Sequence, residues 1–126
     1  MKRKHLAAMA AVLIVASAVL FGFIPNEWMG YSATKTADAL IHTGAGYFYG
    51  FVVKTDGTNS VTLQIYDGTS TGGTRIGPDF LCVTSSSNRM CVFGTGDLPI
   101  PFSTGLYVDV TSSDTTPDYT VFYRGQ

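Results

Sequence analysis

The segment Val61-Thr62-Leu63-Gln64-Ile65-Tyr66 alternates apolar and polar side chains, and Asp67–Gly73 follows it as a stretch rich in Gly, Ser and Thr. Successive side chains of a β-strand point to opposite faces of the sheet. The alternation therefore predicts a strand with Val61, Leu63 and Ile65 pointing inward. The stretch that follows predicts a long turn.

Similar signals recur on both sides of this strand. Asp56-Gly57 predicts a tight hairpin, because Gly adopts a positive φ at low cost. Gly94–Ser103 is predicted to be a loop and Asp114–Asp118 a turn. We therefore predict an all-β fold, a single antiparallel β-sandwich of jelly-roll or immunoglobulin-like type with seven or eight strands, over residues 36–126. The further strands are expected at Ala37–His42, Tyr47–Lys54, Asp79–Thr84, Arg89–Phe93, Leu106–Val110 and Tyr119–Tyr123.

The two cysteines, Cys82 and Cys91, flank the segment Val83–Met90. If this segment folds as a hairpin that turns at Ser86-Ser87, the cysteines lie opposite each other at a separation that a disulfide spans. We predict this disulfide, and closing a loop of about ten residues should stabilise the fold by roughly 2–3 kcal/mol. Two buried free thiols are the alternative, whereas a metal site is disfavoured because no His is near.

The N-terminus differs in composition from the rest of the chain. Leu6–Ile24 is a run of 19 residues without charge, and it follows Met1-Lys2-Arg3-Lys4-His5. A helix of this length spans roughly 28 Å, close to the hydrocarbon thickness of a bilayer. We predict a transmembrane helix within residues 1–27, with its basic end in the cytoplasm, and a linker over residues 28–35. The residues expected to contact lipid are Leu6, Leu13, Ile14, Leu20, Phe21, Phe23 and, at the interface, Trp28.

A cleaved signal peptide is the alternative interpretation of this run. Leu6–Val15 would form its apolar core and Ala16-Ser17-Ala18 its cleavage site, so that the mature chain would begin near Val19. The apolar character continues to Ile24, however, which a signal peptide does not need. Pro25-Asn26-Glu27 then ends the run. These features favour a retained anchor.

The composition after the apolar run excludes several classes of function. This part holds nine acidic and five basic residues, a net charge of −4, and the Lys and Arg residues are not clustered, which argues against nucleic-acid binding. His42 is the one histidine there and Gly-x-Ser-x-Gly is absent, so we expect neither an enzyme nor a bound cofactor. The aspartates mostly lie in or beside turns, where they bond the backbone of the residues that follow. A calcium site built on Asp67 is the alternative.

Two motifs carry a resemblance to a known family. Tyr66-Asp67-Gly68-Thr69-Ser70 with Gly73-Thr74-Arg75-Ile76 is followed later by Pro99-Ile100-Pro101-Phe102-Ser103-Thr104-Gly105-Leu106-Tyr107-Val108. This pattern resembles small β-sandwich modules of bacteriophage virions, found in head-associated, fibre and decoration proteins, and it covers about Tyr47 to Arg124. The resemblance implies a structural role with no catalytic residues to transfer. The N-terminal run and the cysteine pair depart from that pattern and point to a protein rooted in a membrane.

The aromatic residues of Tyr47–Phe51 run almost continuously. Alternation sends Tyr47, Tyr49 and Phe51 to one face and Phe48 to the other. One face would then belong to the core and the other would be covered by a loop or a neighbouring subunit. An aromatic platform for glycans is the alternative. The predicted contact surface consists of Tyr47, Tyr49, Phe51, Asp67, Thr69, Pro99, Pro101 and Phe102.

Together these features predict a non-enzymatic structural protein of a virion, of minor-capsid or decoration type, anchored in a membrane with its C-terminal domain outside the cytoplasm. Its expected partners are membrane lipid, other virion proteins and further copies of itself, as a homo-oligomer, but no nucleic acid. The alternative is a secreted or cell-surface glycan-binding β-sandwich with a cleaved signal peptide.

Overall fold

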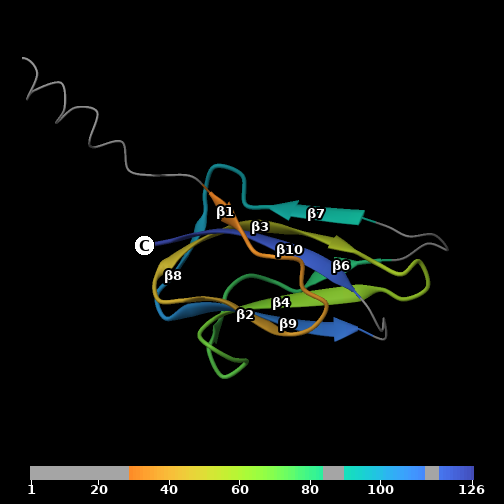
Figure 1. Cartoon of the computed structure of the whole chain (residues 1–126), viewed down its shortest axis with the longest axis horizontal. Coiled ribbons are helices and arrows are strands. Elements are labelled where there is room, and N and C mark those ends of the chain that lie inside the picture. The colour runs from red at the N-terminus through yellow and green to blue at the C-terminus, as the bar shows by residue number, and fades with distance from the viewer. Residues whose placement is uncertain (1–28, 84–89, 113–116) are drawn as a thin grey trace, which may run out of the picture.

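The computed structural model describes residues 29–83, 90–112 and 117–126. Ten strands within these ranges form two antiparallel sheets, which Figure 1 shows as two layers. The described residues contain no helix, and so none that is long and apolar enough to cross a membrane. The predicted transmembrane run, Leu6–Ile24, and the interfacial Trp28 lie outside the described residues.

The first sheet contains β1 (Gly30–Tyr31), β10 (Asp118–Gly125), β3 (Gly46–Lys54) and β7 (Met90–Gly94), each antiparallel to its neighbour. A fifth strand, β8 (Ile100–Phe102), pairs with the first residues of β3. The long strand β3 is therefore central. Along one edge it pairs with β10, and along the other it pairs first with β8 and then with β7.

The second sheet contains β2 (Ala39–Thr43), β9 (Gly105–Ser112), β4 (Val61–Asp67) and β5 (Thr74–Arg75). The short strand β6 (Phe80–Cys82) also pairs with β4. The inward side chains of β4 are fully buried, which confirms the orientation predicted from its alternation. They are Val61, Leu63 and Ile65.

The hydrophobic core lies between the two sheets. Phe48, Phe51 and Val121 enter it from the first sheet, and Leu63 and Val108 enter it from the second. Fully burying an aliphatic or aromatic side chain of this size is worth about 1.5–3 kcal/mol, so this core supplies the main stabilisation. The rings of Phe80 and Phe93 add an aromatic cluster around Phe51, each with its centroid 5.0 Å from that of Phe51.

An irregularity in β3 overturns the predicted alternation of its aromatic residues. The register with β10 shifts so that Gly50 lies opposite Phe122 and Phe48 lies opposite Tyr123, which leaves Tyr49 as an extra residue, a β-bulge. Gly50 has a φ of 149°, a conformation that favours glycine. Because the bulge changes the phase of the strand, Phe48 and Phe51 both enter the core, and the prediction that they face opposite ways is wrong.

Three short strands account for the difference between the predicted seven or eight strands and the observed ten. The predicted linker, residues 28–35, contributes β1 and a bridge between Lys35 and Tyr119. The predicted loop Gly94–Ser103 contains β8. The predicted turn Asp67–Gly73 is followed directly by β5. Pairings of two or three residues are too short to produce an alternating pattern in the sequence.

Candidate functional site

The carboxylate of Asp67 joins two loops at one end of the two sheets. Its Oδ2 accepts hydrogen bonds of 2.9 Å from both the backbone amide and the hydroxyl of Ser103, and its Oδ1 accepts one of 2.7 Å from the amide of Thr104. The amide of Gly68 in turn donates to the carbonyl oxygen of Gly105 at 3.0 Å. We call this arrangement the Asp67 clamp. It fixes the end of β4 against the start of β9.

The clamp also sets the charge state of its carboxyl group. Burial raises the pKa of Asp67, but the hydrogen bonds from Thr104 and Ser103 outweigh it, and the pKa is lowered from its usual value of 3.8. Asp67 is therefore ionised at neutral pH. The calcium site that was the alternative for Asp67 gains no support, because the described residues include no group of three His, Cys, Asp or Glu side chains that could hold a metal ion.

The structure divides the predicted contact residues into three groups. The first group lies at or near the Asp67 clamp: Thr69 and Pro101 are exposed, and Pro99 is partly buried. Tyr47 and Tyr49 are partly buried on the outer side of the first sheet. The two phenylalanines of the set, Phe51 and Phe102, are 0% and 4% exposed and belong to the core, so they cannot take part in an external contact.

An apolar surface that the sequence analysis missed covers the outer side of the first sheet. Val92 of β7 is 72% exposed, and Met90 is 67% exposed. In register Val92 lies opposite Val52, whereas its neighbours Cys91 and Phe93 pack against the core. We call this surface the apolar face. It consists of Met29, Tyr49, Val52, Met90, Val92 and Phe122.

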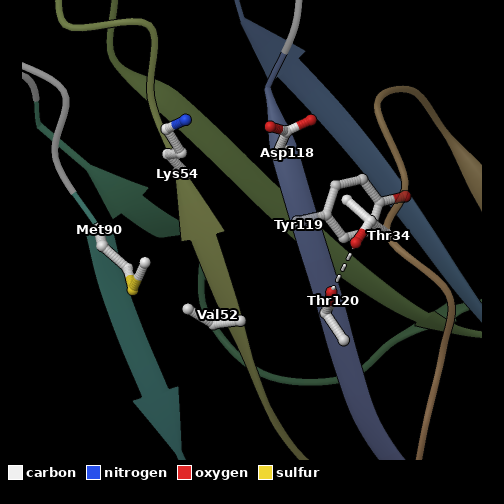
Figure 2. A pocket seen from close by; sticks show the side chains of 7 residues that line it. All are labelled: Thr34, Val52, Lys54, Met90, Asp118, Tyr119 and Thr120. Carbon is white, nitrogen blue, oxygen red and sulfur yellow. Dashed lines mark hydrogen bonds between the residues drawn. The ribbon is translucent and has the colours of Figure 1, made fainter.

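Two shallow hollows lie on the apolar face. One, of about 280 Å³, is lined by Met29, Tyr49, Val92 and Phe122 among others. The second, of about 210 Å³, is drawn in Figure 2, where Met90 and Val52 lie on neighbouring strands and Lys54 stands at the edge. A signal for this face was present in the sequence, because Met90–Phe93 is apolar at every position rather than at alternate ones.

The outer side of the second sheet carries a hydrogen-bonded polar network, next to the exposed Leu40 and Leu81. The hydroxyl of Tyr66 donates to Oε1 of Gln64 at 2.9 Å, and the Gln64 side-chain amide donates to Asp79 at 2.9 Å. Asp79 also forms an ion pair with Arg75. The two outer sides of the molecule thus differ in chemistry.

Two carboxyl groups meet on this polar side. Oδ1 of Asp38 accepts a hydrogen bond of 2.8 Å from the amide of Val110. Burial raises the pKa of Asp109, and the charge of Asp38 and a hydrogen bond with its side chain raise it further. Burial and the same two carboxylates also raise the pKa of the Tyr107 phenol. These groups share one patch, but two carboxyls and a phenol do not complete a catalytic or metal-binding set.

Aromatic and cationic side chains gather where β2 and β10 end and β3 begins. The guanidinium of Arg124 lies 5.0 Å from the ring centroid of Tyr47, a cation–π contact. The ring of His42, the one histidine considered for catalysis, lies 5.9 Å from that of Phe102 and 5.5 Å from that of Tyr123. His42 therefore serves packing in the described structure.

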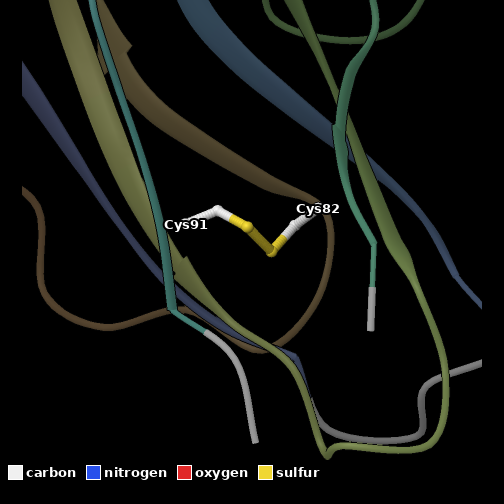
Figure 3. The surroundings of a disulfide bond; sticks show 2 residues. All are labelled: Cys82 and Cys91. Atoms are coloured by element: carbon white, nitrogen blue, oxygen red, sulfur yellow. A yellow bond between two sulfur atoms is a disulfide. The ribbon is translucent and has the colours of Figure 1, made fainter. Parts of the chain in front are cut away.

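The predicted disulfide is present and links the two layers. Cys82 and Cys91 are bonded with their Cα atoms 5.8 Å apart (Figure 3). The predicted hairpin is wrong, however, because Cys82 in β6 lies opposite Val61 in the second sheet, while Cys91 in β7 lies opposite Val53 in the first. The bond therefore ties one sheet to the other. The predicted turn at residues 86–87 lies outside the described residues.

The residues thus form a hydrogen-bonded polar loop end, an apolar face on the first sheet, a polar network on the second sheet and a covalent link between the sheets. Comparison with known proteins adds no assignment to these surfaces: no family model, no curated protein and no solved structure matches the chain. A function for the chain has to account for the surfaces themselves.

Proposed function

We propose that this chain is a non-enzymatic structural protein of a virion, anchored in a membrane by Leu6–Ile24. The two sheets would form a β-sandwich of jelly-roll or immunoglobulin-like type outside the cytoplasm. In this role the apolar run holds the protein to the membrane, and the folded part contacts other virion proteins and further copies of the chain.

The Asp67 clamp is the observation that carries this proposal. The two motifs that resemble phage virion modules, Tyr66–Ser70 and Pro99–Val108, are about 30 residues apart in sequence. The clamp brings them together, since Asp67 belongs to the first motif and its partners Ser103 and Thr104 belong to the second. The two motifs thus form one contact in this fold. Their contact supports the resemblance, because two unrelated turns of similar composition would not need to meet.

The clamped end is suited to contact with protein. Its exposed residues are short, polar and uncharged; Thr69, Ser70 and Thr104 are examples. Loops that are already fixed lose little conformational entropy when a partner binds, which favours a specific and lasting contact. We assign the contacts with other virion proteins to this end, in agreement with the predicted role of Thr69 and Pro101.

Deletion of Met1–Ile24 tests the anchor. We expect the full chain to float with liposomes in a density gradient, and the truncated chain to stay at the bottom as a folded monomeric or oligomeric domain. The intact mass of the native protein is the second measurement. A chain that starts at Met1 supports retention of the run, and a truncated chain that still floats contradicts the anchor.

A glycan-binding module with a cleaved signal peptide is the second candidate. Tyr31 is 75% exposed, and Tyr49 lies on the same outer side of the first sheet, so aromatic rings are available for a sugar to stack on. This candidate predicts a mature chain that begins near Val19 and saturable binding on a glycan array. Binding should be lost in Tyr31→Ala and kept in Tyr66→Ala, on the opposite sheet.

A further inference from the structure

The outer side of the first sheet carries a group of exposed apolar side chains. Met90 and Val92 are 67% and 72% exposed, on the strand at the edge of the sheet, and Met29 is 51% exposed. Large exposed apolar residues that are contiguous mark a contact site, whereas single ones do not. The charged side chains that line this surface, Lys54 and Asp118, lie opposite each other on neighbouring strands at one end of the smaller hollow (Figure 2).

We propose that the apolar face lies against the lipid surface in which the N-terminal run is anchored. The proposal rests on the proposed function, because it requires the run to enter a membrane. It goes beyond that function by assigning one specific side of the folded part to lipid, with the Asp67 clamp left free for protein neighbours.

The contrast between the two outer sides is the first argument. An antiparallel sheet commonly packs one face on the core and exposes the other to water. The second sheet does so, with Gln64, Asp79 and Arg75 joined in a polar network. The first sheet has Val52, Val92 and Met90 at comparable outward positions. Leu40 and Leu81 are also exposed on the second sheet, so the two sides differ in how many apolar side chains they gather and in the polar network.

The position of the first described residue is the second argument. Met29 lines the larger hollow of the apolar face together with Val92 and Phe122. It follows Ile24, the last residue of the apolar run, by five positions, so even a fully extended connection spans at most about 18 Å. Two packed sheets are separated by about 10 Å before their outer side chains are counted. The tether therefore keeps the side that carries Met29 within about 18 Å of the end of the apolar run, and the other outer side lies farther away by at least the sheet separation.

The side chains of the apolar face suit the boundary between headgroups and acyl chains. Tyr49, and Tyr31 beside the face opposite Phe122, are amphipathic rings of the kind enriched at that boundary. Val92 and Met90 provide aliphatic contact, and the two charges at the margin, Lys54 and Asp118, are of opposite sign. The contact is small, but the anchor keeps the face at a high local concentration near lipid, so weak contacts suffice. The truncated domain lacks this advantage and is not expected to float.

A second copy of the chain is the competing occupant. Among the described strands, β7 pairs on one edge alone, with β3, and a free edge strand can pair with its own copy. We favour the lipid because Met29 lines the larger hollow and is also the described residue nearest to the apolar run. Met29 directly precedes β1, which lies at the edge of the sheet opposite β7. The two occupants give different results in the following experiment.

Tryptophan quenching in liposomes distinguishes the two sides. Trp28 is the single tryptophan, so Trp28→Phe gives a silent full-length background. Into it we would place either Val92→Trp, on the apolar face, or Leu81→Trp, which replaces a residue 52% exposed on β6 of the other sheet and serves as the matched control. The probe is phosphatidylcholine brominated in the acyl chain near the headgroup, mixed with phosphatidylglycerol.

We expect the lipid to quench the Val92→Trp variant at least about twofold and to leave the Leu81→Trp variant nearly unchanged, as for side chains at the headgroup–acyl boundary. Equal quenching of both, or of neither, in chains that float overturns the lipid contact and leaves the anchor intact. Blue-shifted emission from the Val92→Trp variant that bromine does not quench also overturns it, and indicates a protein occupant such as a second copy. A full-length chain that fails to float contradicts the proposed function instead.

Discussion

Asp67 and Thr104 are 37 residues apart in the chain and are joined by a hydrogen bond of 2.7 Å from the Thr104 amide to the Asp67 carboxylate. With the two bonds from Ser103, one side chain satisfies donors that would otherwise face water at the start of β9. Hydrogen bonds to a charged acceptor are roughly twice as strong as neutral ones. Asp67 thus gives more order to the loop end than its position in a turn suggests.

Asp67→Asn tests the clamp. The amide keeps one acceptor oxygen but turns an NH₂ group toward donors, so we expect the free energy of unfolding to fall by about 1–3 kcal/mol. The value should lie in the lower part of this range, because the site is partly open to solvent. Urea denaturation of the domain measures it. Asp97→Asn, at an exposed aspartate, is the control, and a similar loss in both variants contradicts the clamp.

The same substitution has a defined pH dependence. The pKa of Asp67 is lowered in the folded state, so its stabilising contribution is present above the unfolded value of 3.8 and is lost as the pH falls through the folded value. We therefore expect the stability difference between the wild type and Asp67→Asn to shrink between about pH 5 and about pH 2. A difference that stays constant over this range indicates that ionisation is not involved.

The link between Cys82 and Cys91 should stabilise the fold through the unfolded state. The bond closes a loop with a sequence separation of 9, which corresponds to roughly 2–3 kcal/mol on the chain-entropy model. Because it joins β6 to β7, its loss should also let the two sheets separate more easily at this end. Chemical denaturation with and without reductant measures the bond without changing packing.

The double substitution Cys82→Ala with Cys91→Ala completes this test. We expect it to lose more stability than the reduced wild type, since Cys82 is fully buried and its sulfur also fills space in the core. A mass increase of about 2 Da on reduction verifies the bond itself. A double variant as stable as the oxidised protein contradicts the stabilising role.

Gly50→Ala tests the bulge in β3. Gly50 has a φ of 149°, and a Cβ atom there would overlap the carbonyl oxygen of Phe93. We expect a loss of about 3 kcal/mol or more, because overpacking adds to backbone strain. Gly44→Ala is the matched control: its φ is 96°, but nothing lies near the added atom, so a loss of about 1 kcal/mol is expected. Equal losses would mean that strain alone matters.

Strands that are long and regular could be predicted from the sequence. Val61, Leu63 and Ile65 alternate with polar residues, and all three are buried as predicted. The local turn at Asp56 was also predictable, since Asp56 accepts hydrogen bonds from the amides of Thr58 and Asn59. Both features depend on residues within a few positions of each other. The tight hairpin predicted at Asp56-Gly57 is wrong, however, because the strands on either side, β3 and β4, belong to different sheets.

Features that depend on distant segments could not be predicted. Asp67 was expected to bond the residues that follow it, yet its partners lie on another strand and the loop before it. Cys82 was placed correctly in a disulfide but wrongly in a hairpin, because β6 pairs with β4 and not with β7. The bulge at Gly50 likewise depends on β7 and β10. In each case the local sequence allows more than one partner or conformation, and a contact with a distant segment determines which one forms.

Asp109→Asn should make the protein more stable at neutral pH. Burial raises the pKa of Asp109, as do the charge of Asp38 and the hydrogen bond to it, so the folded state prefers the protonated form. The ionised form costs stability, and this cost appears as the pH rises from below 3.8 through the folded pKa. Asn carries no charge and can donate to the Asp38 carboxylate. We expect a gain of up to about 1 kcal/mol at neutral pH, the magnitude of a repulsion between like charges in a sheet.

The pH profile separates this cause from a general effect of the substitution. Below about pH 3 the wild-type carboxyl is protonated in both states, so the two proteins should have nearly the same stability, and the gain should develop as the pH rises toward about 7. Thermal unfolding at a series of pH values measures it. The double variant Asp38→Asn with Asp109→Asn should gain little beyond the single one, because one substitution already removes the repulsion. A gain that is equal at acid and neutral pH would mean that Asp38 and Asp109 do not repel each other in the folded protein.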